Sequence, residues 1–212
     1  MILIGQYDSP FVRRVAVAMT LYGLTFEHRT WSVWADADKL AEVNPLRRVP
    51  TLILEDGEVL IESGAILDAL DEMAGPANAM LPRSGPERRR ALKICALATG
   101  LADKAVILFY EGILHESPSQ VWTLRCRAQI GDVLTVLEVE RARTASVWWL
   151  GQSIGHPDIA VACAVRFARE AHPGLFDPAR WPRLAAHAEA CEALPAFQAI
   201  CQPISVTMKE EA

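Results

Sequence analysis

The chain has 212 residues, of which 51% are hydrophobic, so it can form one large domain or two small ones around a sizeable buried core. These values exclude an intrinsically disordered protein and a small disulfide-rich scaffold. The formal net charge of -5 at pH 7 argues against a protein that binds duplex nucleic acid, which normally presents a dense Lys/Arg face to the phosphates.

The cysteines are scattered along the chain without a C-x-x-C pair or a His-rich neighbour, so the sequence predicts neither a metal site nor a redox dithiol. Their odd number fits no complete disulfide framework, which is typical of a reducing compartment. The first residues lack the basic segment and the apolar run that are typical of a signal peptide, and no stretch is long enough to span a bilayer. We therefore expect a cytoplasmic protein without a membrane anchor. The cysteines are Cys95, Cys126, Cys163, Cys191 and Cys201.

Strand-like and helix-like patterns alternate over residues 1–76, which is typical of an α/β unit. Asp56-Gly57 lies between two apolar runs and predicts a tight hairpin, so these two strands are antiparallel. The order strand, helix, strand, helix, strand, strand, helix is that of a thioredoxin-like domain. The predicted elements are a strand over 2–4, a helix from Pro10 that stops at Gly23, a strand over 26–33, a short helix over 36–43, strands over 51–54 and 59–61, and a helix from Ser63 to near Gly75.

The chain from Gly75 to Gly85 is rich in Pro, Gly, Ala and Asn, a composition typical of a linker between domains, and we place the linker at residues 77–85. The remaining residues, 86–212, carry helical patterns that no strand pattern interrupts. The predicted fold class is therefore an α/β thioredoxin-like domain followed by an all-α helical bundle.

Two segments match helix starts in the second domain. Ser84-Gly85-Pro86-Glu87 has the spacing of a capping box and predicts a long helix, and Ser117-Pro118 predicts the start of the next helix. Further helices are predicted over residues 157–171, 180–190 and 195–200.

Ser9 stands just before Pro10, at the amino end of the first predicted helix. Free backbone amides and the helix dipole stabilise negative charge at such a terminus, and the Ser9 hydroxyl could donate directly to a bound thiolate. The alternative is that Ser9 is only an N-cap, because Ser followed by Pro is a common helix start.

Two further motifs precede or follow predicted strands. Pro50 stands at the start of a strand, which a cis Val49-Pro50 bond would explain, and the Val49 backbone could then pair with an extended peptide. A trans proline at a strand start is the alternative. Glu62 and Ser63 lead from a strand into a helix, and together they could hold the ammonium and carboxylate of an α-amino acid. Otherwise Ser63 caps that helix and Glu62 favours its dipole.

The three motifs, in this order, resemble those of the glutathione transferase family, and the similarity covers essentially the whole chain. The family pattern has S-P-F-x-x-R-V, then N-P-x-x-x-V-P-x-L, then E-S, and the resemblance is to bacterial members and to the theta-like and tau-like classes that use serine. The matching segments here are Ser9 to Val15, Asn44 to Leu52 and Glu62-Ser63.

The resemblance implies a role for each of these residues. Ser9 would hydrogen-bond the glutathione sulfur, Val49 would pair with the cysteinyl backbone, and Pro50 would be cis. Glu62 and Ser63 would hold the γ-glutamyl end. These residues, with Arg48, form the predicted glutathione site.

Several positions bear on this assignment. Arg48 stands where a Lys is frequent and could attract the glycine carboxylate, whereas Arg47 departs from the common Gly. Tyr7 is the rival to Ser9, because other classes of the family use a Tyr near the end of the first strand. In the helical domain, Gly155 replaces the usual Ser/Thr cap, although Asp158 can still reach back to the cap amide.

The resemblance implies that glutathione is a co-substrate and that its thiolate attacks a small hydrophobic electrophile, without a metal. The lack of Cys at position 9 disfavours chemistry through a mixed disulfide. A glutathione-dependent isomerase, dehalogenase or peroxidase would use the same thiolate, and a non-catalytic transferase-like binding protein would not activate it. The family is usually a homodimer formed between the N-terminal domain of one subunit and the helical domain of the other.

Overall fold

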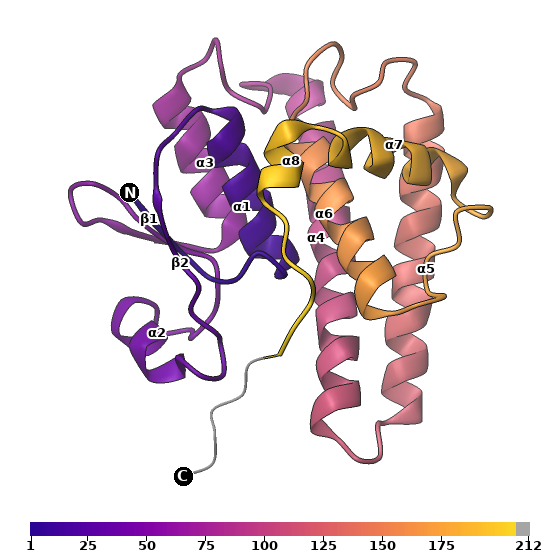
Figure 1. The fold of residues 1–212 in the computed structure, drawn as a ribbon. Helices are drawn as coiled ribbons and strands as arrows, with labels where there is room; N and C mark the ends of the chain where they lie inside the picture. The colour runs from indigo at the N-terminus through magenta and orange to yellow at the C-terminus, as the bar shows by residue number, and fades with distance from the viewer. Residues whose placement is uncertain (207–212) are drawn as a thin grey trace. The chain divides into compact units, whose positions relative to one another are not determined.

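The computed structural model describes residues 1–206 and divides into two compact units (Figure 1). One unit consists of Met1–Ala79 together with the chain from Pro195 onward, and the other of Met80–Leu194. The division between Ala79 and Met80 falls within the predicted linker. The last residues of the predicted helical domain, 207–212, lie outside the described residues.

The N-terminal unit contains the four strands that the sequence predicts. They are ordered β2-β1-β3-β4, with β1 parallel to β2 and antiparallel to β3, and with β4 antiparallel to β3. The predicted thioredoxin-like order of strands and helices is confirmed. The strands are β1 (Ile2–Ile4), β2 (Glu27–Arg29), β3 (Thr51–Ile53) and β4 (Val59–Ile61).

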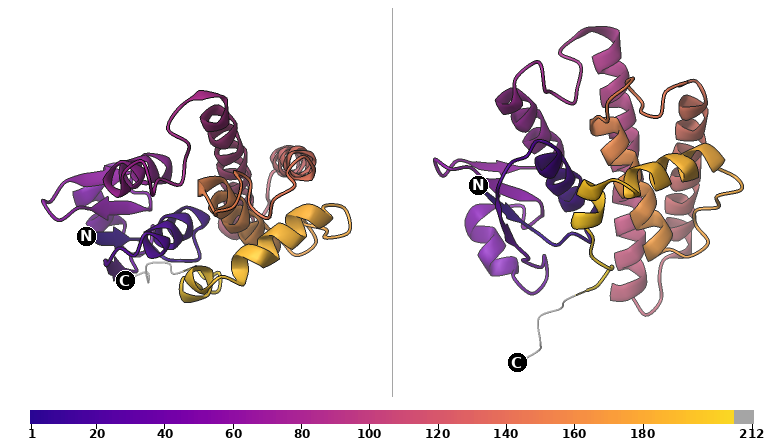
Figure 2. Two further views of the ribbon diagram at one scale, coloured as in Figure 1. Left: turned by 90° about the horizontal axis from the view of Figure 1, so that it is seen from above. Right: turned by 45° about the horizontal axis from the view of Figure 1, so that its top comes forward.

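Within residues 1–206, four helices belong to this unit. Helix α1 packs against α3 and also against α8, and α2 lies apart from this group (Figures 1 and 2). Val15 of α1 and Ile66 and Leu70 of α3 are fully buried, as their one-face spacing predicts. The helices are α1 (Pro10–Leu21), α2 (Ala37–Val43), α3 (Ser63–Ala74) and α8 (Pro195–Ala199).

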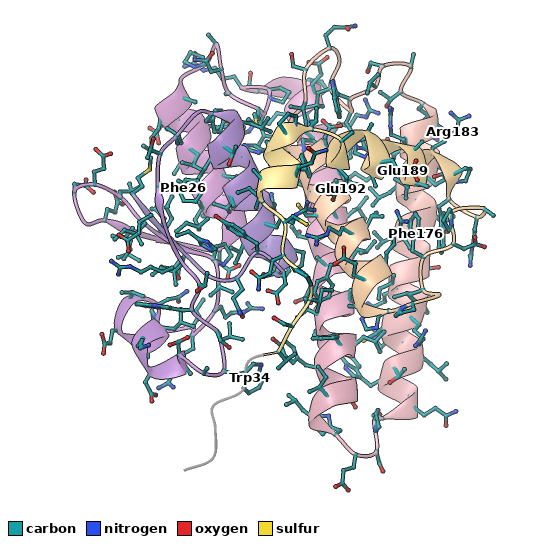
Figure 3. The ribbon with its side chains drawn as sticks, in the orientation of Figure 1. Phe26, Trp34, Phe176, Arg183, Glu189 and Glu192 are labelled. Carbon is teal, nitrogen blue, oxygen red and sulfur yellow. The ribbon has the colours of Figure 1, made fainter. Side chains whose placement is uncertain are left out.

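Strand β2 is shorter than the predicted strand over residues 26–33. The backbone N–H of Ser32 donates to Asp36 Oδ2 at 3.0 Å, and Ser32 Oγ accepts the N–H of Trp34 at 3.2 Å. These bonds form a turn that takes the chain out of the sheet, and Trp34 is labelled within this turn in Figure 3. Alternation of apolar residues alone could not reveal this turn.

The second unit is a helical bundle, as predicted. Helix α4 packs against α5 and α6, and α7 packs against α5 and α6. Leu184 and Cys191 of α7 are buried, whereas Arg183 and Glu189 on the same helix are exposed (Figure 3). Across residues 1–206, no helix combines the length and hydropathy needed to cross a membrane. The helices are α4 (Gly85–Leu114), α5 (Gln120–Ala142), α6 (His156–Ala171) and α7 (Pro182–Glu192).

Two predicted caps differ in the structure. Helix α5 is capped by Ser119 and not by Ser117: the Ser119 hydroxyl accepts the N–H of Trp122, and its own N–H donates to Glu111 Oε1 at 2.8 Å. Helix α4 does begin after Ser84, but the Ser84 side chain makes no capping bond, so the predicted capping box is wrong.

The start of α6 explains why glycine replaces the usual hydroxyl residue. The N–H of Gly155 donates to Asp158 Oδ2 at 2.9 Å, so the predicted reach of Asp158 to the cap amide is confirmed. A Cβ at position 155 would lie 2.8 Å from the carbonyl oxygen of Met80, a separation that real Cβ atoms essentially never show. The close approach of Met80 therefore excludes a side chain at this cap.

Candidate functional site

The strand register brings the three predicted motifs to one end of the sheet. Ile4, at the end of β1, pairs with Thr51, at the start of β3, and Thr51 pairs with Ile61, at the end of β4. Neighbouring strands lie about 4.8 Å apart, so this row of three residues spans roughly 10 Å. The segment that follows Ile4 carries Ser9, Val49-Pro50 precedes Thr51, and Glu62-Ser63 follows Ile61.

Ser9 is the N-cap of α1. Its hydroxyl oxygen accepts the N–H of Val12 at 3.4 Å, and its carbonyl oxygen accepts the N–H of Arg13 at 2.9 Å. The capping role is thus confirmed, and it uses the hydroxyl oxygen only as an acceptor. Because a hydroxyl can accept and donate at the same time, the Ser9 O–H can still donate to a bound sulfur.

The amino end of α1 favours an anion. Its first turn contains no acidic residue. Pro10, at the first helical position, has no N–H, and the N–H of Val12 is bonded to Ser9. The first backbone amide of the helix that an anion could meet is therefore that of Phe11. The helix dipole adds positive potential at this end. The Ser9 hydroxyl and the helix terminus therefore act in the same direction on a thiolate placed beside Ser9.

Tyr7 is less well placed for this role than Ser9. Its ring stacks on the imidazole of His28, with centroids 3.8 Å apart and an interplanar angle of 4°. Burial raises the pKa of the Tyr7 phenol, which makes it a weaker proton donor. Tyr7 also precedes the cap by two positions, so its side chain is not part of the helix terminus.

The Val49-Pro50 peptide bond is cis, as predicted. Val49 packs against Gly5, which directly follows β1 and has a φ of 127°. A Cβ at Gly5 would lie 2.8 Å from Val49 Cβ and 2.5 Å from Val12 Cγ2, so no side chain fits at this position. Gly5 thus sets how closely Val49 approaches the start of α1. Our sequence analysis missed this residue, although a glycine directly after a strand is a recognisable signal.

Asn44 holds the segment that carries Arg48 and Val49. Its side chain is buried, and Nδ2 donates to the carbonyl oxygen of Arg48 at 2.9 Å and to Thr51 Oγ1 at 3.1 Å. Asn44 Oδ1 accepts the N–H of Leu46 at 3.0 Å. Three bonds from one amide therefore define the turn before β3. Asn44 belonged to the matched motif, but its supporting role was not part of our prediction.

The turn contains Arg47 in the left-handed region, with a φ of 51°. This conformation costs a non-glycine residue roughly 1–2 kcal/mol, which explains why glycine is common here. Arg47 Nη1 lies 3.4 Å from Asp38 Oδ1, in an exposed ion pair. The Arg47 backbone therefore has the conformation that glycine would adopt in this turn, and its guanidinium pairs with Asp38.

Arg48 and Glu62 form an ion pair at 3.6 Å, and their side chains are 61% and 57% exposed. Such an exposed pair contributes at most about 1 kcal/mol, so it separates at little cost. In this structure the Arg48 guanidinium lies beside the carboxylate that we assigned to the γ-glutamyl end. Contact with a glycine carboxylate at the other end of the tripeptide requires the Arg48 side chain to turn away from Glu62.

Glu62 and Ser63 lie at the junction of β4 and α3. Glu62 has a φ of 65° and makes no side-chain capping bond, and Ser63 is the first residue of the helix and is buried. Neither residue therefore serves as the ordinary side-chain cap that we considered as an alternative. Backbone strain of this kind gathers at ligand sites, where the surrounding structure maintains it.

The comparisons with known proteins agree with this geometry. Residues 3–78 match the glutathione S-transferase N-terminal domain, and residues 120–190 match the glutathione S-transferase C-terminal domain. The uncharacterized GST-like protein YibF of Escherichia coli (strain K12) is 34% identical over 175 residues, which cover 81% of this chain and 85% of that protein.

Two similar solved structures contain glutathione or a derivative of it. A glutathione S-transferase of Methylobacterium radiotolerans in complex with glutathione sulfonate has a TM-score of 0.89 and 30% identity, covering 100% of this chain and 98% of that one. A glutathione transferase family member of Pseudomonas fluorescens Pf-5 with bound glutathione has a TM-score of 0.84 and 33% identity, covering 96% and 99%. With this fold and these relatives, the chain belongs to the glutathione S-transferase family.

Proposed function

We propose that the protein is a glutathione transferase in which Ser9 activates the glutathione thiol for attack on a small hydrophobic electrophile. The observation that carries the proposal is the hydrogen bonding of Ser9: its oxygen accepts the Val12 amide, which leaves the O–H free to donate at a helix amino end. The two glutathione-containing relatives support the choice of co-substrate.

The activation that we propose is modest in energy. Lowering the pKa of a thiol by about two units corresponds to about 2.7 kcal/mol of preference for the thiolate. A helix terminus contributes up to about 2 kcal/mol in favourable geometry, and a hydrogen bond to a charged group contributes about 1.5–3 kcal/mol. Ser9 and the end of α1 together are therefore sufficient for this shift.

The other predicted residues bind the rest of the tripeptide in this proposal. The Val49 backbone pairs with the cysteinyl residue, and cis Pro50 orients it. Glu62 pairs with the γ-glutamyl ammonium, and Ser63 with the first amides of α3 binds its carboxylate. The Arg48 side chain attracts the glycine carboxylate once its ion pair with Glu62 has separated.

We extend the proposal to a homodimer in the cytoplasm. Exposed apolar side chains occur on both units: Val59 and Met73 on the N-terminal unit, and Leu92, Val136 and Val139 on α4 and α5. A dimer that joins one unit of each copy to the other unit of its partner would cover these side chains. Sedimentation at several protein concentrations tests this part of the proposal.

The function is tested by incubating the protein with glutathione and a panel of electrophiles, and by identifying the products by mass spectrometry. The panel includes a chloronitrobenzene, an organic hydroperoxide and a haloalkane. We expect the wild-type protein to form glutathione conjugates with the chloronitrobenzene, Ser9→Ala to lose most of this rate, and Ser9→Thr, which keeps a hydroxyl, to retain part of it.

The panel also distinguishes a peroxidase and a dehalogenase from a transferase. Turnover of the hydroperoxide alone would indicate a peroxidase, and release of halide without a stable conjugate would indicate a dehalogenase. Glutathione binding without turnover of any electrophile would contradict the proposal and leave the isomerase and the non-catalytic binding protein as the alternatives.

A further inference from the structure

The chain after α8 lies against the segment that carries Ser9. We call residues 200–206 the C-terminal clasp (Figure 1). Gln202 Oε1 accepts the backbone N–H of Tyr7 at 3.0 Å, and the backbone N–H of Ser205 donates to Asp8 Oδ2 at 3.1 Å. The clasp therefore bonds to each of the two residues that directly precede Ser9, although it is separated from them by more than 190 positions along the chain.

A buried arginine anchors the start of the clasp. Arg13, on the first turns of α1, is 1% exposed, and its Nε donates to the carbonyl oxygen of Ile200 at 2.8 Å. Its Nη2 donates to the carbonyl oxygen of Phe197 at 3.0 Å, and the guanidinium lies 5.4 Å from the centroid of the Phe197 ring. The clasp thus begins at a fixed point on the helix whose amino end Ser9 caps.

We propose that the C-terminal clasp positions Ser9 for thiol activation, with Gln202 as its main positioning residue. The inference rests on the proposed function, because it assigns a role in the activation of the same thiol. Tyr7 and Asp8 are not part of a helix or strand, and within their own segment they are held by a turn in which the N–H of Ser9 donates to the carbonyl oxygen of Gln6 at 3.2 Å. The bond from Gln202 to Tyr7 and the bond from Ser205 to Asp8 add to this single turn bond and tie both residues of the turn to the clasp.

The clasp also acts on the charge beside Ser9. The carboxylate of Asp8 is adjacent in sequence to the hydroxyl that must stabilise a thiolate, and a nearby negative charge raises the pKa of a thiol. The N–H of Ser205 bonds to Asp8 Oδ2 and holds this carboxylate in the direction of the clasp. Loss of that bond removes this restraint on the direction of the Asp8 carboxylate.

The test uses full-length variants with matched controls. Gln202→Met keeps the size of the side chain and removes the acceptor for the Tyr7 amide, and Gln120→Met makes the same chemical change at an exposed position on α5, outside the clasp. Asp8→Asn and Asp8→Ala both remove the charge, but only Asp8→Ala also removes the acceptor for Ser205. The pair therefore separates the hydrogen bond from the charge.

Three quantities are measured: the pKa of the bound glutathione thiol from its ultraviolet absorbance, kcat/KM with a chloronitrobenzene, and amide hydrogen exchange in residues 5–13. We expect Gln202→Met to raise the thiol pKa, to lower kcat/KM by about tenfold, and to speed exchange in this segment. Affinity for S-methylglutathione, which has no ionisable thiol, should stay within about twofold of wild type. Gln120→Met should behave as wild type.

The inference is overturned if Gln202→Met leaves both the thiol pKa and the amide exchange of residues 5–13 unchanged. It is also overturned if Asp8→Ala and Asp8→Asn have the same thiol pKa and the same amide exchange in this segment. Failure of the proposed function is a different result, in which the wild-type protein itself shows no thiolate signal. In that case the exchange data, which need no glutathione, still decide whether the clasp restrains the Ser9 segment. Circular dichroism and urea midpoints identify a variant that fails to fold, and the Asp8 pair then carries the test.

Discussion

Asp158 Oδ1 lies 2.8 Å from Nε2 of His187, and neither side chain is exposed. The same carboxylate accepts the N–H of Trp149 at 3.0 Å and the N–H of Gly155 at 2.9 Å. One buried carboxylate therefore joins the start of α6 to α7 and to the segment before α6. Our sequence analysis assigned Asp158 only its bond to the cap amide.

We predict that Asp158→Ala destabilises the protein by about 3–5 kcal/mol, because it leaves three buried donors without their acceptor. Urea unfolding followed by circular dichroism measures the change in the free energy of unfolding. Glu189→Ala, on the exposed side of α7, is the control and should change it by less than about 0.5 kcal/mol. A loss below about 1 kcal/mol in Asp158→Ala would show that the carboxylate is not a structural centre of the helical unit.

Gly155 gives a second prediction on stability. Serine is the better cap by intrinsic preference, but a Cβ at this position would meet the Met80 carbonyl oxygen at 2.8 Å. We expect Gly155→Ser to lower the free energy of unfolding by about 1–3 kcal/mol in urea unfolding, as overpacking does. Gly100→Ala is the matched change, because nothing lies within 4 Å of a Cβ there, and it should raise stability by about 0.5–1 kcal/mol. A stabilised Gly155→Ser would mean that Met80 moves away readily.

The caps and strands also show what the sequence could predict. The hairpin at Asp56-Gly57 and the helix start at Ser9-Pro10 were correct, because turn and cap residues act locally. The start of α5 was misplaced by two residues, because Ser117 and Ser119 both suit a cap. The choice between them depends on the bond from Ser119 to Glu111, which is eight positions away and leaves no mark in the local pattern.

The candidate site divides in the same way. Three motifs at the ends of strands predicted Ser9, Val49-Pro50 and Glu62-Ser63, and the register of the sheet brings these motifs to one end. The residues that support these motifs were missed. The need for glycine at position 5 depends on how closely Val49 approaches it, and Gln202 bonds to Tyr7 from 195 positions away. Such long-range contacts are set by packing and not by local spacing.

Asn44 should be essential to the turn that carries Arg48 and Val49. In Asn44→Asp, the donor that serves the Arg48 carbonyl and Thr51 becomes a carboxylate oxygen, which repels the Arg48 carbonyl oxygen. We expect glutathione affinity, measured by isothermal titration calorimetry, to fall by about tenfold or more, and stability to fall by about 1–3 kcal/mol. Gln152→Glu, the same change from amide to carboxylate at an exposed position, should change neither quantity. Unchanged affinity in Asn44→Asp would contradict the role given to this side chain.

His172 predicts a dependence of stability on pH. Burial, assisted by nearby Arg127, lowers the pKa of His172 below its ordinary value of 6.5, although its hydrogen bond to the carbonyl oxygen of Ala105 acts in the opposite direction. Below pH 6.5 the unfolded chain therefore binds more protons than the folded protein at this residue. The stability that neutral His172 provides is present above pH 6.5 and is lost as the pH falls toward the folded pKa.

Urea unfolding between about pH 7.5 and about pH 5 measures this slope. His172→Gln does not titrate and keeps a side-chain donor for the Ala105 carbonyl oxygen, so it should show a smaller loss of stability over this range. Equal slopes in the variant and the wild-type protein would assign the pH dependence to other groups.

The central claim is that Ser9 activates the thiol, and an ultraviolet titration of bound glutathione against pH tests it most directly. We predict that the thiol ionises about two pH units below free glutathione in the wild-type protein, and close to free glutathione in Ser9→Ala. Tyr7→Phe should titrate as the wild-type protein does. If Ser9→Ala keeps the wild-type titration, or if Tyr7→Phe is the variant that loses it, Ser9 is only a helix cap and the account is wrong.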